Sequence, residues 1–475
     1  MSTHEPVFRE RRSGNFQQIV AGFLGHDGLP FASVLSAERI TRVFIKHAGL
    51  FGFSGVYSTA MVLWAFLAQV LADGKGAACR AAVANVVSHC LQRGKEPPTA
   101  DTGDYCRARA KLSAAALREL SCDVASEVEN QAEEAWLWKG HHAKLVDGFT
   151  FTMPDTPANQ KQFPQNPVQE PGVGFPIARA VGVVSLATAC VLDATVGPYQ
   201  GKQTGETSLL RSLLGSFDAG DVAVMDRYYC SFMMIALFAQ QQTHVCARLH
   251  HLRKADFRKG RRLGKRDRLV QWVRPQRPAW MDEATYESIP ETLELRLLQF
   301  QIEEPGRRTA VITIATTLTD ADEYSKEDIA RLYGFRWNIE LDIRSIKQNL
   351  NLDHMRCKTP KMIHIEFRTT LLAYNLIRSV SVTAASLHDK KPRQISFVST
   401  CQYVMTSWVS LSLGQIPKRR FETYCRAILK QIAACEVGNR PGRLEPRVIK
   451  KRPKSYKLMQ QPRNVLREQL RKSCT

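Results

Sequence analysis

The sequence predicts an α/β protein whose core is a mixed β-sheet flanked by helices. Three observations support this prediction. An Ala- and Leu-rich helical region occupies the first 135 residues or so, strand-like alternation begins at Ala143, and helices and strands then alternate along the chain. A hairpin followed by alternating helices and strands is typical of a mixed sheet covered by helices. After about residue 390 the chain is again helical in character and ends in a basic, Pro-containing tail.

The predicted elements of the sheet follow one another from residue 143. "AKLVDGFTFTMP" alternates in the manner of a strand, and residues 180–197 form a run of β-formers broken near its middle, which indicates a hairpin. The elements expected next are a helix at 206–217, a strand at 221–226, a helix at 231–242 and a strand at 244–249. Between residues 250 and 320, two further alternating segments predict an antiparallel β insertion.

The charge of the chain indicates a polyanionic partner. Its 475 residues contain 66 Lys and Arg against 45 Asp and Glu, a net charge of +21. Two runs concentrate this charge, at residues 253–274 and 447–457, so the chain is not uniformly basic. Nucleic acid is therefore a more plausible partner than a membrane surface.

Cysteine usage and hydropathy indicate a cytoplasmic protein. The twelve cysteines include no CxxC pair, so neither a zinc motif nor a secreted disulfide framework is expected. The longest apolar run, residues 58–72, is too short to span a bilayer and predicts a core helix.

The segment "YGFRWNIELDIRSIKQNL", residues 333–350, predicts an amphipathic helix. At 100° per residue, four side chains fall within an arc of about 60°, and Arg344 extends the same stripe. These four are Tyr333, Arg336, Glu340 and Lys347. The apolar residues Leu332, Ile339, Ile343, Ile346 and Leu350 form a neighbouring face, and Asp342 lies away from both. The stripe fits the wall of a cleft, and it fits equally a solvated face with a Glu340–Arg344 pair.

Three acids stand on separate predicted elements. Asp147 lies in the first strand, Asp226 at the carboxyl end of the strand "VAVMD", and Glu340 in the later helix. Three carboxylates at one point would repel each other unless a divalent cation neutralised them, and oxygen ligands suit Mg²⁺ or Mn²⁺. Two such ions can support phosphodiester cleavage. Asp155 and Asp193 are rivals for the first acid; "PDTP" suits Asp155 to a turn, and Asp193 is better explained as structural.

The spacing Tyr333–Arg336–Glu340–Lys347, Y-x2-R-x3-E-x6-K, resembles the signature of the bacterial insertion-sequence-four family of transposases. "DGFTFTMPDTPANQ", "GKQTGETSLL", "MDRYYCSF" and "LLAYNLIR" resemble the same family, and the likeness covers nearly the whole chain. It implies a ribonuclease-H-like catalytic core with an Asp-Asp-Glu triad and a β insertion between the second Asp and the Glu.

The resemblance also implies roles for individual residues. Asp147, Asp226 and Glu340 would be catalytic metal ligands for Mg²⁺, with Mn²⁺ as substitute and two ions in number. Tyr333, Arg336 and Lys347 would bind phosphates of the terminal DNA, and Arg344 and Arg227 are expected beside them. The expected regions are a helical DNA-binding domain at 1–135, a catalytic domain at 136–390 interrupted by the insertion at 250–320, and a helical region with a basic tail at 391–475.

The implied function is a DNA transposase that cuts at the terminal inverted repeats of its own element and joins the ends to target DNA. Its partner would be double-stranded DNA, bound by a homodimer, in the bacterial cytoplasm at the nucleoid. Two alternatives stay open: a non-catalytic DNA-binding protein derived from a transposase, and a host nuclease of ribonuclease-H fold. Inverted repeats flanking the gene would favour the DNA transposase over both alternatives.

A transposase of this family closes its cut ends as hairpins, and a hairpin requires a flipped base. An aromatic side chain is the usual holder of such a base. Trp272 and Trp280 in the insertion are candidates, although either could simply cover a small core. Trp272 is preferred because Arg268 and Arg274 flank it and could hold phosphates.

Overall fold

The computed structural model describes residues 37–47, 49–52, 55–92, 94–302, 310–412, 418–438 and 457–473. The chain forms two compact units. The helical unit comprises Met1–Trp136, Ala187–Asp193 and Leu341–Val437, and the sheet unit comprises Leu137–Leu186, Ala194–Glu340 and Gly438–Thr475.

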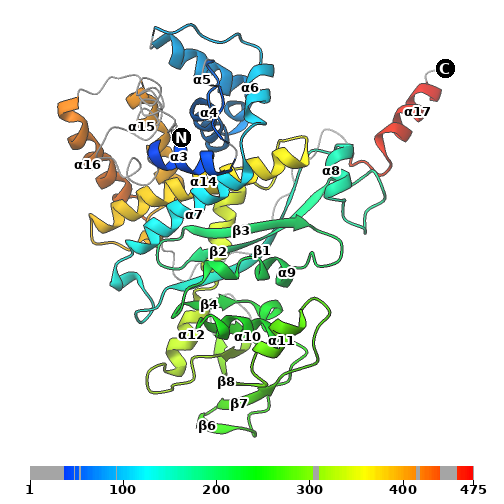
Figure 1. Ribbon diagram of the computed structural model, residues 1–475, viewed down its shortest axis with the longest axis vertical. Coiled ribbons are helices and arrows are strands. Elements are labelled where there is room, and N and C mark those ends of the chain that lie inside the picture. Colours follow the sequence, from blue (N-terminus) through cyan, green and yellow to red (C-terminus); the bar gives the residue numbers. More distant parts are fainter. Residues whose placement is uncertain are drawn as a thin grey trace, which may run out of the picture. The chain divides into compact units, whose positions relative to one another are not determined.

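A nine-stranded mixed sheet confirms the predicted fold class (Figure 1). Its strand order is β3-β2-β1-β4-β5-β9-β8-β7-β6. Strand β1 pairs antiparallel with β2 and parallel with β4, which in turn pairs parallel with β5. An antiparallel meander followed by two parallel strands is the ribonuclease-H-like order. The core strands are β1 (Ala143–Thr152), β2 (Ile177–Ser185), β3 (Val191–Pro198), β4 (Val222–Met225) and β5 (His244–Arg248).

The predicted β insertion is present, and it continues the core sheet. Strand β9 pairs antiparallel with β5, with Cys246 opposite Thr316, and β8, β7 and β6 follow as antiparallel neighbours. The insertion is thus fixed to the core by backbone hydrogen bonds. Its strands are β6 (Arg261–Gly264), β7 (Asp267–Val273), β8 (Thr292–Ile302) and β9 (Ala310–Thr316), and it also holds helix α11 (Glu283–Ser288).

Short, capped helices connect the strands of the sheet unit. Ser231 caps α10, and a capping box between Ser325 and Asp328 begins α12. The helix expected at 206–217 ends early, at Arg211, and a 3₁₀ turn follows it. The helices of this unit include α8 (Pro157–Gln162), α9 (Glu206–Arg211), α10 (Phe232–Gln240), α12 (Lys326–Gly334) and, near the carboxyl end, α17 (Arg463–Ser473).

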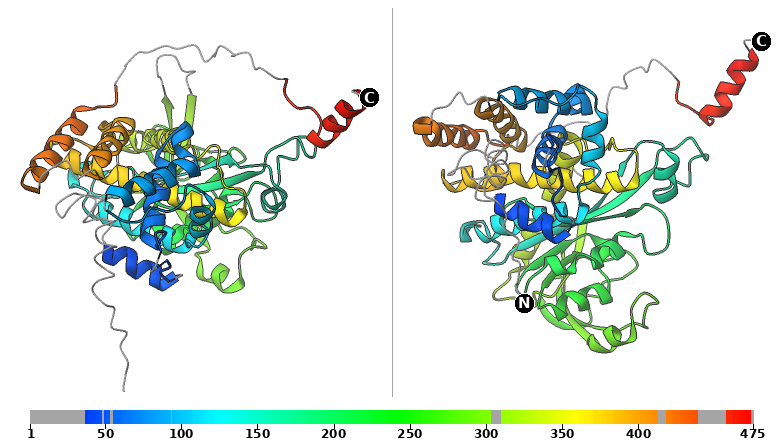
Figure 2. Two further views of the ribbon diagram at one scale, coloured as in Figure 1. Left: turned by 90° about the horizontal axis from the view of Figure 1, so that it is seen from above. Right: turned by 45° about the horizontal axis from the view of Figure 1, so that its top comes forward.

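The helical unit is built around the long helix α14 (Pro360–Ser386). Helix α4 (Thr59–Leu71) is buried along its whole length, which confirms the predicted core helix, and no helix of the described residues is long and apolar enough to cross a membrane. Both views of Figure 2 show the yellow α14 running beside the cyan α7 (Ala114–Asn130). The other helices are α3 (Ala37–His47), α5 (Cys79–Gln92), α6 (Gly103–Arg109), α15 (Phe397–Ser412) and α16 (Lys418–Ala434).

A buried acid ties the segments of the helical unit together. Asp342 is 1% exposed and accepts hydrogen bonds from Arg378 at 3.1 Å and from Arg393 at 2.9 Å. The Tyr374 hydroxyl donates to the same carboxylate at 3.3 Å. Two residues of the "LLAYNLIR" motif therefore hold a buried charge that would otherwise be costly to desolvate.

The insertion contains its own buried ion pair. Arg296 in β8 donates to Asp267 in β7 through Nε at 2.9 Å and a terminal nitrogen at 2.6 Å, and both side chains are almost fully buried. A second terminal nitrogen of Arg296 donates to the Tyr324 carbonyl. This pair locks β7 and β8 to the loop that precedes α12.

Replacing Asp267 should therefore destabilise the sheet unit. Asp267→Ala leaves the Arg296 guanidinium buried without its counter-charge, at an expected cost of about 3–5 kcal/mol in the free energy of unfolding. Chemical denaturation followed by circular dichroism measures the loss. Asp256→Ala is the matched control, because Asp256 pairs with Arg258 in solvent on the same insertion. Equal effects of the two substitutions would contradict this account.

Candidate active site

Strand pairing brings the first two acids together. The parallel register between β1 and β4 ends with Val146 opposite Met225, so Asp147 and Asp226 are the next residues on adjacent strands. Neighbouring strands lie about 4.8 Å apart. Asp226 leaves the strand and precedes the 3₁₀ turn Arg227–Tyr229, in which Arg227 is half-buried. Asp147, in the middle of β1, and Asp226, just after the carboxyl end of β4, are thus neighbours.

Arg336 joins the third acid to this pair. Its guanidinium donates to Asp147 Oδ2 at 3.2 Å and to Glu340 Oε1 at 3.1 Å. Glu340 lies in helix α13 (Trp337–Arg344), and Arg336 lies immediately before it. Arg336 is only 8% exposed. One buried cation therefore bridges the first and third predicted acids.

The electrostatics of the site show a concentration of negative charge. Burial raises the pKa of Asp147 to about 6. Glu206 and Glu340 act in the same direction, whereas Arg336 and the N–H of Gly148 oppose the rise. Burial by itself would lower the pKa of Arg336, but Tyr333, Asp147, Asp226 and Glu340 raise it above its ordinary value. Arg336 therefore interacts electrostatically with the three predicted catalytic acids and with Tyr333.

The donor set fits a hard divalent cation. It consists of carboxylate oxygens alone, the ligands that Mg²⁺ and Mn²⁺ prefer. In the described part of the chain, no group of three or more His, Cys, Asp or Glu side chains is arranged to hold a metal, and Arg336 lies between Asp147 and Glu340. Arg336 Nε is buried without a hydrogen-bond acceptor, so the guanidinium is incompletely satisfied where it lies.

The segment 333–350 is not the continuous helix that its periodicity predicted. Helix α12 ends at Gly334, and the chain turns tightly as Arg336 N–H donates to the Tyr333 carbonyl. Helix α13 follows, and then a π-helical turn at Ser345–Asn349. The four side chains consequently do not share one exposed stripe: Tyr333 is 4% exposed. Likewise, Glu340 pairs with Arg336, not with Arg344 as the solvated-face alternative required.

The remaining residues of the predicted stripe lie in the helical unit. Arg344 is exposed at the end of α13. Lys347 forms an ion pair with Asp353 at 2.8 Å. Neither position by itself tests the predicted phosphate contacts, which stay predictions.

The two rival acids occupy structural positions. Asp155 is exposed beyond β1 and accepts a hydrogen bond from Gln160 at 2.9 Å, in keeping with a turn residue. Asp193 is buried and paired with Arg118 and Arg368 in the helical unit. Asp147 is the acid that the structure brings to Arg336 and Glu340.

The two arginines that flank Trp272 contact the backbone of the insertion. Arg268 donates to the Phe257 carbonyl and Arg274 to the carbonyls of Tyr286 and Ile289, so both guanidinium groups are engaged locally. Trp272 is 9% exposed, with Arg253 stacked 3.9 Å above its ring. Its contact with a flipped base stays a prediction, and such a base would first have to displace Arg253.

Glu206 is a carboxylate near the site that the sequence reasoning missed. It is the first residue of α9 and accepts a hydrogen bond from the Tyr229 hydroxyl at 3.2 Å. Its motif, "GKQTGETSLL", indicates a likeness to the insertion-sequence-four family and no role for Glu206. The sequence shows Glu206 as an acid in the first turn of a predicted helix. An acid at that position is common at helix termini, so it does not indicate a catalytic site.

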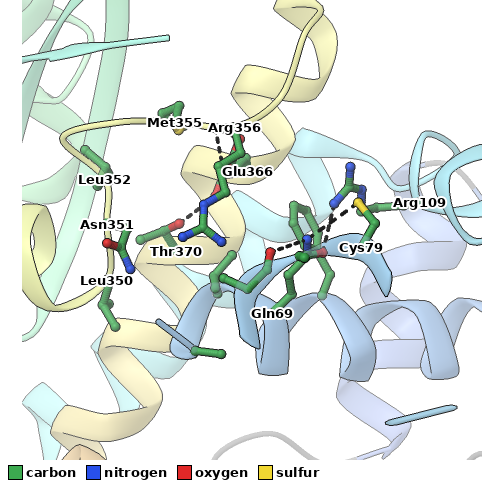
Figure 3. A pocket seen from close by; sticks show the side chains of 15 residues that line it. Gln69, Cys79, Arg109, Leu350, Asn351, Leu352, Met355, Arg356, Glu366 and Thr370 are labelled. Atoms are coloured by element: carbon green, nitrogen blue, oxygen red, sulfur yellow. Dashed lines mark hydrogen bonds between the residues drawn. The ribbon is translucent and has the colours of Figure 1, made fainter. Parts of the chain in front are cut away.

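A separate cavity of about 190 Å³ lies within the helical unit, and none of the predicted site residues lines it (Figure 3). The Gln69 side chain is the centre of its polar wall: Gln69 Oε1 accepts from Tyr105 and Arg109, and Gln69 Nε2 donates to the Ala77 carbonyl. Apolar side chains such as Leu350 and Met355 complete the lining. The polar atoms of Gln69 in this cavity thus have hydrogen-bond partners within the helical unit.

The chain resembles known transposases in sequence. The model of the Transposase DDE domain family matches residues 138–376. Transposase InsG for insertion sequence element IS4, from Escherichia coli (strain K12), is 27% identical over 358 residues, which cover 74% of this chain and 76% of that protein. Putative transposase InsL for insertion sequence element IS186A, from the same strain, is 38% identical over 69 residues, 14% of this chain and 18% of that protein.

Among solved structures, the piggyBac transposase synaptic complex with hairpin DNA covers 91% of this chain and 86% of its own chain, with a TM-score of 0.43 and 10% identity. The family match spans half of the chain and includes Asp147, Asp226 and Glu340. The chain is therefore a member of the DDE transposase family, of the insertion-sequence-four type, and a DNA transposase.

Proposed function

We propose that this transposase cuts DNA at the terminal inverted repeats of its own element and joins the freed ends to target DNA, with Asp147, Asp226 and Glu340 as its catalytic acids. The observation that carries the proposal is the bridge from Arg336 to Asp147 and Glu340, beside the strand that bears Asp226. A buried arginine that holds two acids together keeps a metal-binding set assembled while no cation neutralises it.

Each residue of the site has a distinct part in this mechanism. Asp147, Asp226 and Glu340 would hold Mg²⁺, or Mn²⁺ as its substitute, as two ions that activate the attacking water or hydroxyl and stabilise the leaving oxygen. Arg336 would turn from the acids to a phosphate of the bound DNA strand. Tyr333 and Lys347 would contact neighbouring phosphates, with Arg344 and Arg227 beside them.

A basic hollow on the insertion is well suited to a DNA backbone. It has a volume of about 830 Å³ and lies beside β6, the last strand of the sheet. Its lining contains six basic side chains, Lys254, Arg258, Arg262, Lys265, Arg266 and Arg268, against the single acid Asp256. Five strand spacings of about 4.8 Å separate β6 from β4, roughly 24 Å. That distance corresponds to about seven base pairs, so the same duplex could reach both the hollow and the acids.

Two copies of the protein would act together on the paired ends of the element. Light scattering of the protein on end-containing DNA tests this proposal, and a complex with a single copy per pair of ends would contradict it.

Loss of any catalytic acid should abolish cleavage and leave DNA binding intact. Asp147→Ala, Asp226→Ala and Glu340→Ala each remove an oxygen ligand without changing the basic surfaces. Cleavage of a labelled end fragment and its retention in a gel-shift assay measure the two properties separately. Asp155→Ala is the control and should cleave like the wild type, because its carboxylate contacts Gln160 in solvent. An active Asp147→Ala variant would remove Asp147 from the site.

Cation affinity should fall at acidic pH. The pKa of Asp147 is raised to about 6, above its ordinary value of 3.8, so the carboxyl stays protonated in a range where most aspartates are ionised. At pH 5 about a tenth of it is ionised, and at pH 7.5 nearly all of it is. Mn²⁺ titration calorimetry should therefore find binding about tenfold weaker at pH 5. Equal affinities at the two pH values would show that Asp147 is not a ligand.

Neutralising the hollow should weaken DNA binding in a salt-dependent way. Each phosphate contact contributes about 0.9 to the slope of log affinity against log salt concentration, so Arg262→Ala combined with Lys265→Ala should reduce the slope by up to roughly two units. Fluorescence anisotropy over a series of salt concentrations measures it. Lys161→Ala, exposed on α8 of the same unit, is the control. A slope unchanged in the double variant would exclude the hollow as a DNA site.

A further inference from the structure

Glu206 packs against the strand that carries the first catalytic acid. A methyl group added at Gly148, the residue after Asp147, would lie 2.4 Å from Glu206 Cδ and 2.7 Å from its Oε1. No real side chain tolerates such distances, so the Glu206 carboxylate occupies the space that a side chain at position 148 would need. Gly148 has no left-handed backbone conformation. A side chain at position 148 would therefore displace the Glu206 carboxylate from β1.

The same carboxylate contacts the element that carries the second acid. Tyr229, whose hydroxyl donates to Glu206 Oε2, is completely buried and belongs to the turn that directly follows Asp226. A buried phenol with a carboxylate acceptor is a costly contact to break, because its hydroxyl would lose its partner away from water. Glu206 thus touches both acid-bearing elements, one through each side of its carboxylate group.

We propose that Glu206 is a positioning residue that fixes the spacing between Asp147 and Asp226. Successive side chains of a strand point to opposite faces, so Glu206 supports β1 at Gly148 from the face opposite the Asp147 side chain. It holds β1 and the turn after β4 in one register. The inference rests on the proposed function, since it assigns Glu206 to the same pair of acids.

A purely local role for Glu206 makes different predictions. As the first residue of α9, its charge also favours the amino end of that helix. Loss of that effect would change stability alone. Loss of the support for β1 would change how tightly the acids hold a cation, and outer-shell partners of metal ligands typically alter metal affinity by about 10–100-fold.

The test compares Mn²⁺ affinity, by titration calorimetry, with melting temperature and end cleavage. Glu206→Ala should weaken Mn²⁺ binding and cleavage by about tenfold or more, and Glu170→Ala, exposed in the same unit, should change neither. Gly148→Ala should weaken both to a similar extent, because the new methyl group displaces the Glu206 carboxylate. Adding Glu206→Ala to Gly148→Ala should then cause little further loss.

Two results would overturn the inference: Mn²⁺ affinity unchanged in Glu206→Ala, or a double variant much weaker than either single variant. Should Glu206→Ala fail to fold, Tyr229→Phe removes only the hydroxyl and should weaken Mn²⁺ binding severalfold, whereas unchanged affinity would count against the inference. If Asp147→Ala binds Mn²⁺ like the wild type, the proposed function itself fails. Binding that requires Asp147 but ignores Glu206 contradicts only the inference.

Discussion

The guanidinium of Arg336, placed between Asp147 and Glu340, is the interaction on which the acid site depends. Burial is the main cause of the raised pKa of Asp147, and repulsion from Glu206 and Glu340 adds to it. Arg336 offsets it with a buried positive charge that contacts both acids. The bridge requires the parallel pairing of β1 with β4 and the tight turn before α13. The sheet and the helix junction of this unit thus serve one electrostatic arrangement.

The sequence was informative where local periodicity decides the structure. Alternation around Asp147 predicts a strand that the structure contains, and the apolar run before Asp226 predicts a strand that the structure ends one residue earlier, at Met225. It was less informative at 333–350, where a continuous helix was predicted. Gly334 was the available warning, since glycine commonly follows the end of a helix. A helical period cannot reveal a bridge between an arginine and an acid 189 residues away.

Long-range contacts account for the other residues that sequence reasoning could not place. Tyr374 and Arg378 belong to the motif "LLAYNLIR", which in the sequence indicates only a resemblance to the family. In the structure both side chains donate hydrogen bonds to the buried Asp342. Glu206 is the first residue of the helix predicted at 206–217, and only the packing against Gly148 reveals its position. The charge of the insertion was visible in composition, whereas its direct pairing with β5 was not. That pairing places a basic hollow and the acids on one continuous sheet.

The most direct measurement of the central claim is a crystal structure of the protein with Mn²⁺ and an end-containing DNA fragment, with the ions located by anomalous scattering. The account predicts Mn²⁺ about 2.1 Å from oxygens of Asp147, Asp226 and Glu340, with Arg336 turned away from both acids toward a phosphate. Mn²⁺ bound elsewhere, with Arg336 still bridging Asp147 and Glu340, would contradict it.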